Sequence, residues 1–156
     1  MFTSQYLIPF LEKEYKLTQK ALRAFPAEQM DYQPHPKSMS IKQLMRAFGA
    51  DLSIANLILK GEEITDPYAG VPEITDPEQA AQTIDDLLGQ LVETLKQTNA
   101  EDLNKDLELW GQTHTVAQWV LAMLSDTIHH RGQLTVYIRL AGGLVPSIYG
   151  PSADEQ

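Results

Sequence analysis

Residues 115–141, TVAQWVLAMLSDTIHHRGQLTVYIRLA, carry the pattern that decides the fold. Apolar residues recur there at alternating steps of three and four, the period of one face of a helix. These residues are Val116, Val120, Met123, Leu134 and Tyr137. The segment opens on a Thr-x-x-Gln capping box and is followed by two glycines, signals for the start and the end of a helix. The pattern predicts a helix over 115–141 with one buried face.

Three other segments show the same period. A first helix is expected over residues 3–25, a second from Ser40 to about Gly61, and a third from Asp76 to about residue 98. Ser40 opens a second capping box, and Asp76 is followed by a proline at the first helical position. The stretches 26–38, 62–75 and 144–156 contain prolines and have no helical period, so we expect them to be irregular.

Four helical segments, without convincing strand alternation or an internal repeat, predict an all-α protein with the architecture of a four-helix bundle. The connections 26–38 and 62–75 are long enough to be crossovers, so a simple up-and-down order of helices is not required. A chain of 156 residues corresponds to about one domain. We therefore expect residues 1–156 to form a single domain.

The composition limits the classes of function. With 43% hydrophobic and 21% charged residues, the chain resembles ordinary soluble globular proteins. It has no cysteine, which excludes disulfides, a thiolate nucleophile and zinc–sulfur sites. A net charge of −9 argues against nucleic acid as a partner. No segment approaches ~18 uninterrupted apolar residues, so we expect a cytoplasmic protein without a membrane span.

Asp126 and His130 form the clearest candidate for a functional site. They are four residues apart, so on a helix both side chains leave one face and can share a ligand. His130 lies in the apolar stripe, which indicates that it points inward. The pair has two interpretations: a metal or catalytic group, or a buried ion pair that satisfies both side chains. Asp51 is the next candidate, at the edge of the stripe on the second helix, although an isolated aspartate there is more often solvated or a cap.

Two arginines lie on the same predicted helix. Arg131, beside an internal pocket, could bind an anionic substrate group through two hydrogen bonds, because a guanidinium matches a carboxylate in this way. For Arg139 we favour a structural salt bridge with an acidic residue. Trp110 and Trp119 are most simply interpreted as core or interface aromatics.

Residues 129–139 (HHRGQLTVYIR), with Val145-Pro146 and 148–155 (IYGPSADE), resemble the DinB-like (YfiT-like) family. Pro26, residues 32–34 (YQP) and residues 37–39 (KSM) also match, so the resemblance spans essentially the whole chain. It implies a four-helix bundle, commonly a dimer, in which three histidines hold a divalent metal. One histidine comes from the second helix and two come from the fourth, spaced as His-x-x-x-His. Some relatives of this kind transfer low-molecular-weight thiols such as bacillithiol.

Carried over to this chain, the resemblance implies an altered metal site. His130 matches the second histidine of the fourth helix, Asp126 stands where the first would be, and the histidine of the second helix would fall near Ala47. A His/Asp pair can bind Zn, Ni, Mn or Fe, and Asp51 as a third ligand would favour Mn or Fe, because these metals suit oxygen ligands. Alternatively, the site is degenerate and holds no metal.

Two functions therefore stay open. One is a metal-dependent thiol S-transferase acting on a small thiol or another small molecule, with Arg131 binding the substrate. The other is a metal-free, non-catalytic bundle that binds a small ligand or a protein partner. A homodimer is expected in either case.

Overall fold

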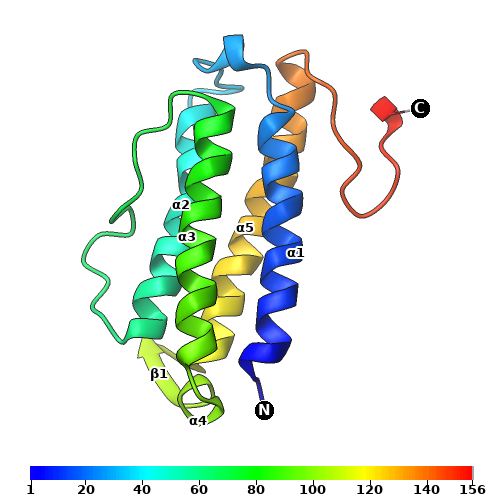
Figure 1. Cartoon of the computed structure of the whole chain (residues 1–156). Coiled ribbons are helices and arrows are strands. Elements are labelled where there is room, and N and C mark those ends of the chain that lie inside the picture. Colours follow the sequence, from blue (N-terminus) through cyan, green and yellow to red (C-terminus); the bar gives the residue numbers. More distant parts are fainter. Residues whose placement is uncertain (156) are drawn as a thin grey trace.

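The computed structural model describes residues 1–155 and confirms the predicted four-helix bundle (Figure 1). The long helices are α1 (Ser4–Arg23), α2 (Ile41–Lys60), α3 (Pro77–Gln97) and α5 (Val116–Leu140). α2 packs against α3 and α5, and α1 packs against the same two helices. Buried leucine, isoleucine and aromatic side chains from all four fill the space between them. None of the described helices has the length and the apolar character that a membrane span requires.

The order of the helices explains the two long connections. In Figure 1, α1 and α5 run in one direction, whereas α2 and α3 run in the other. Because α2 and α3 are parallel neighbours, the connection between them must return along the length of the bundle, and residues 61–76 do so. This connection is the crossover that the sequence suggested. The connection between α1 and α2 stays at one end of the bundle, where it spans the diagonal between two helices that do not pack against each other, and it contains a short 3-10 turn, Ala27–Gln29.

The ends of the helices follow the capping signals of the sequence. Ser40 and Thr115 each make both hydrogen bonds of a capping box, and the Asp76 side chain accepts from the third amide of α3. Gly61 ends α2 with a φ of 66°, which a glycine adopts without a steric penalty. α1 ends at Arg23, two residues before the predicted boundary at Phe25. Ala24 and Phe25 then donate to the carbonyls three residues earlier, a tighter turn than that of an α-helix, before Pro26.

The segment between α3 and α5 corrects the prediction that strands are absent. It contains a short helix, α4 (Ala100–Leu103), and a hairpin of β1 (Asp106–Leu109) and β2 (Gln112–Thr115). Trp110 and Gly111 form the turn with φ values of 52° and 73°, the positive pair that joins two strands with matching twist. The alternation of Leu107 and Leu109 with charged residues was the feature of the sequence that could have predicted a strand here. Trp119 is buried as predicted, whereas Trp110 is 62% exposed and rests edge-on against it.

The crossover connection is fixed on α2 by close packing. At Gly49 an added Cβ would lie 2.6 Å from Cγ1 of Val71, so the absence of a side chain lets the connection approach the helix. One turn later the Ser53 hydroxyl donates to the carbonyl of Ala69 at 2.8 Å. Val71 is itself buried. These contacts seat residues 69–71 firmly against α2.

We predict that Gly49→Ala destabilises the protein by about 1–3 kcal/mol, because Val71 is buried and stiff and must move. Alanine otherwise favours a helix by about 1 kcal/mol over glycine. Gly89→Ala is the matched control, since Gly89 lies in α3 with open space around its Cα. Urea unfolding should show a loss for Gly49→Ala and a small gain for Gly89→Ala. Equal gains at both positions would contradict the packing described.

Candidate functional site

A group of polar side chains lies between α1, α2 and α5, and it contains all three predicted metal-site residues. Asp51 of α2 is buried, and its Oδ2 accepts a hydrogen bond of 2.7 Å from the Thr127 hydroxyl of α5. The hydroxyl of Thr127 lies 3.2 Å from the buried phenol of Tyr15 on α1. Asp126 faces Asp51, and His130 follows one turn along α5. Three helices therefore contribute to one hydrogen-bonded group.

Asp126 and His130 differ in exposure. The His130 Nε2 lies 3.3 Å from Oδ2 of Asp126, and the side chains are 12% and 52% exposed, respectively. His130 also pairs through Nδ1 with Gln133 Oε1 at 3.1 Å. His130 points inward as its place in the apolar stripe indicated, whereas Asp126 shares that face only in part. The buried face of α5 passes through Thr127, so Asp126 is rotated by about 100° toward solvent.

Asp51 is not the solvated or capping aspartate that its position on the helix suggested. Burial raises the pKa of Asp51 to about 8, and the charge of Asp126 with a hydrogen bond to it adds to this effect, whereas the Thr127 hydroxyl opposes it. At neutral pH the Asp51 carboxyl is therefore mostly protonated and can donate to Asp126. Burial, together with the charge of Asp51, also raises the pKa of the Tyr15 phenol.

The three predicted ligands meet, but they do not form a ready metal centre. Two carboxyl groups and one imidazole are chemically suitable for a divalent ion. Among residues 1–155, however, no three histidine, aspartate or glutamate side chains come together in an arrangement that could hold one. Ala47, where the family resemblance places a histidine, is buried and offers no donor. The geometry fits a hydrogen-bonded group and does not fit a preformed three-ligand site.

Arg131, the predicted substrate-binding residue, is buried in the bundle. Its Nη2 lies 2.7 Å from Oε2 of Glu14, and its Nη1 donates to the Glu14 carbonyl at 2.7 Å and to the Thr18 hydroxyl at 3.2 Å. The Tyr149 phenol bonds to both charged groups. The guanidinium thus already has partners within the protein, and substrate binding by Arg131 stays a prediction.

Glu14 was not among the candidate residues that the sequence indicated. The helical period offered a signal, because Glu14 follows Leu7 and Leu11 on the face that buries Thr18. Arg139, by contrast, makes the structural salt bridge that we favoured, at 3.0 Å from Asp154.

We predict that Glu14→Gln lowers the free energy of unfolding by about 3 kcal/mol, because it leaves the Arg131 charge buried without its partner. Glu12→Gln is the control, since Glu12 is an exposed residue of the same helix and should change stability by less than about 0.5 kcal/mol. The double variant Glu14→Leu/Arg131→Met should recover most of the loss. Equal stability of Glu14→Gln and Glu12→Gln in urea unfolding would refute this role.

A second prediction concerns pH. Because the folded pKa of Asp51 is raised to about 8, the native state keeps a proton that the unfolded chain releases near its ordinary value of about 4. The associated stability is complete below about pH 4 and is lost as the pH rises through 8. Asp51→Asn can keep the hydrogen bonds without ionising. Its advantage over the wild type should grow by about 2 kcal/mol or more between pH 4 and pH 9, as measured by urea unfolding. Parallel pH profiles would show that Asp51 carries no such shift.

Known proteins are similar to this chain in sequence and in fold. The model of a family described as the DinB family matches residues 1–156. The uncharacterized protein YrdA of Bacillus subtilis (strain 168) is 25% identical over 158 residues, which cover 98% of this chain and 92% of YrdA.

Two solved structures are also similar. A DinB-like protein from Bacillus cereus ATCC 10987 is 26% identical, with a TM-score of 0.69 over 88% of this chain and 92% of its own. The DinB-like protein YjoA of Bacillus subtilis is 22% identical, with a TM-score of 0.73, and the match covers 93% of this chain and 98% of YjoA. This likeness supports the fold alone. With a family model that matches its whole length, the chain belongs to the DinB family.

Proposed function

We propose that this DinB-family protein works without a resident metal and binds a small ligand at the Asp51–Asp126–His130 group. One observation carries the proposal: the side chains that could serve as metal ligands are bonded to protein groups. Asp51 accepts from Thr127 and faces Asp126, and Asp126 pairs with His130. A site arranged in this way suits hydrogen bonding better than metal coordination.

The exposed side of the group indicates what kind of ligand it accepts. Asp126 is half exposed, and its carboxylate can only accept hydrogen bonds once it is ionised. His129 and Gln133 lie beside it on α5, with the Gln133 amide nitrogen 3.0 Å from Nε2 of His129. A ligand that presents an N–H or O–H group to Asp126 complements this surface.

A second candidate is the metal-dependent thiol S-transferase with an altered site. The adjacency of two carboxyl groups and an imidazole favours it, because this set suits Mn or Fe better than Zn. In this case an ion would have to replace the proton that Asp51 shares with Asp126, and the side chains would have to turn toward it. The two candidates differ in whether the isolated protein retains a divalent metal.

The homodimer stays a prediction for either candidate. The outer faces of α1 and α5 carry exposed apolar side chains that a second copy could cover, namely Tyr6, Phe10, Val136 and Leu140.

We predict metal at background level in untagged protein after incubation with Mn, Fe, Ni or Zn and desalting, as measured by plasma mass spectrometry. Chelator should leave the melting temperature unchanged, because no ion stabilises the native state. About one ion per chain would overturn the proposal if it were lost in Asp126→Asn and His130→Gln but kept in His35→Gln. His35 is exposed and lies in the connection between α1 and α2, which makes it the matched control.

A positive test completes this experiment. Small amides and alcohols should shift the backbone NMR signals of residues 126–133 in the wild type and lose this effect in Asp126→Asn. A fragment library without any binder at this face would reject the ligand site, whatever the metal content.

A further inference from the structure

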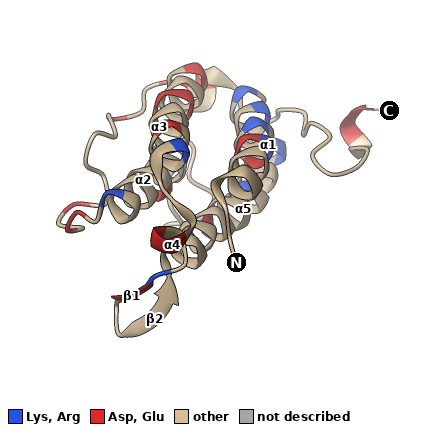
Figure 2. Ribbon diagram, turned by 60° about the horizontal axis from the view of Figure 1, so that its bottom comes forward, with Lys and Arg blue, Asp and Glu red and all other residues tan. Residues whose placement is uncertain are grey.

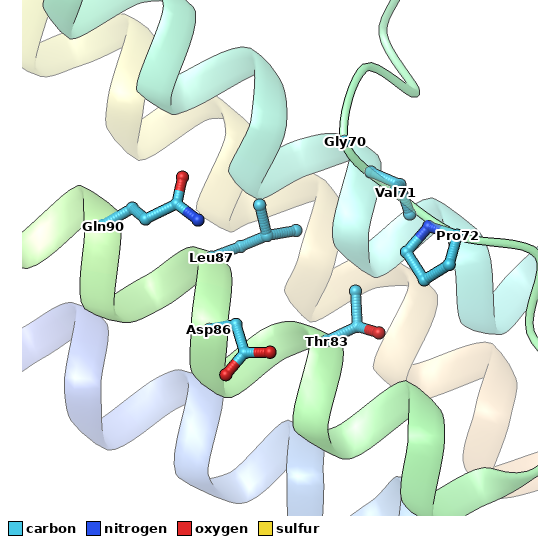
Figure 3. A pocket seen from close by; sticks show the side chains of 7 residues that line it. All are labelled: Gly70, Val71, Pro72, Thr83, Asp86, Leu87 and Gln90. Carbon is cyan, nitrogen blue, oxygen red and sulfur yellow. The ribbon is translucent and has the colours of Figure 1, made fainter.

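A groove that is separate from the Asp51 group lies between the crossover connection and α3 (Figure 3). Its volume is about 570 Å³, within the range of roughly 300–1,000 Å³ that small-molecule sites occupy. The segment Gly70–Pro72 forms one wall, and Thr83, Asp86, Leu87 and Gln90 of α3 form the other. None of these residues belongs to the site described above.

The wall formed by the connection is held in place from behind. Besides the packing of Val71 against Gly49, the Arg46 side chain of α2 donates to the carbonyl of Val71 at 3.2 Å. The same guanidinium pairs with Glu73 at 2.6 Å and lies 4.6 Å from the centre of the Tyr68 ring. A wall with this many contacts is present before any ligand arrives, which lowers the cost of binding.

The polar side chains that line the groove offer mainly hydrogen-bond acceptors. Asp86 is the one charged residue among those that line it, and its Oδ1 accepts a hydrogen bond of 2.9 Å from the Gln82 amide, which leaves the carboxylate further lone pairs to accept with. The Thr83 hydroxyl donates to the carbonyl of Gln79 at 2.9 Å, so its lone pairs remain able to accept. Leu87, Val71 and Pro72 add apolar surface beside these groups (Figure 3). Asp and Glu also prevail over Lys and Arg on α3 as a whole (Figure 2).

The wall formed by α3 is also held from behind, by Asn56. Asn56 of α2 is only 5% exposed, and its Nδ2 donates to the carbonyl of Leu87 at 3.1 Å. Its Oδ1 is buried and has no hydrogen-bond partner in the described structure. Asn56 follows Gly49 and Ser53 on the face of α2 that contacts the connection. Asn56 does not line the groove, so its contact with Leu87 steadies the wall formed by α3 and offers nothing to a ligand directly.

We propose that this groove binds a small organic cation, a primary ammonium with a short apolar chain. The ammonium pairs with Asp86, and the chain lies on Leu87, Val71 and Pro72. An ammonium has three donors and no acceptor, which complements a site that offers acceptors and one negative charge. The inference does not depend on the function proposed for the Asp51 group.

The test uses n-butylammonium as the probe and follows the backbone NMR signals of the full-length protein. We expect saturable shifts at residues 70–72 and 83–90, with a dissociation constant on the order of millimolar for so small a molecule. Asp86→Asn should weaken binding at least tenfold, because a charge-assisted hydrogen bond is lost. Butyrate and 1-butanol, which share the chain but not the charge, should bind at least tenfold more weakly.

Asp85→Asn is the matched control. Asp85 is the adjacent residue on α3, carries the same charge and faces α1, where it accepts from Gln19 at 3.2 Å. It should leave the affinity for n-butylammonium within twofold of the wild type. Equal affinity in Asp86→Asn and the wild type would overturn the proposal, and so would shifts that map to Asp126 instead of the groove. Urea unfolding of each variant verifies that a loss of binding does not reflect a loss of fold.

Discussion

The buried ion pair between Glu14 and Arg131 is the interaction on which the arrangement of the site depends. Both side chains are almost fully buried, and a buried charge is strongly unfavourable unless it is paired. Only one register of α1 against α5 brings these two residues together. Since Tyr15 follows Glu14 and Thr127 lies one turn before Arg131, the same register places the Tyr15 phenol beside the Thr127 hydroxyl. Thr127 then meets Asp51, and the polar group is complete.

The C-terminal tail belongs to this arrangement. The Tyr149 phenol reaches the ion pair, and the pKa of Tyr149 is raised, first by burial and then by its hydrogen bond to Glu14. Lys20 donates to the carbonyl of Ser147 at 3.0 Å, and Asp154 pairs with Arg139. The tail therefore packs back over α1 and α5 and closes the end of the ion pair that faces outward.

The same scaffold can support different chemistry at its centre. A side chain that is hydrogen-bonded to another protein group cannot coordinate a metal unless the ion displaces that partner. Here the Asp51 carboxyl and the imidazole of His130 both approach Asp126, so the geometry gathers two protein groups around one carboxylate. The family resemblance implies three histidines around an ion, and this chain has Asp126 and Ala47 where two of them would stand. This difference is consistent with the metal-free function proposed above. Family membership therefore establishes the fold of this chain more firmly than its reaction.

The sequence by itself determined the four long helices, most of their ends and the closeness of Asp126 to His130. These features depend on interactions within about four residues, such as capping boxes and helical spacing, which the local sequence specifies. The hairpin was missed because its strands are short and its turn begins with a tryptophan. The tertiary structure alone decided that Glu14 pairs with Arg131, that Asp51 is buried beside Thr127, and that the crossover rests on Gly49. These contacts join residues distant in the chain, and only the packing of the helices brings them within hydrogen-bonding or van der Waals distance.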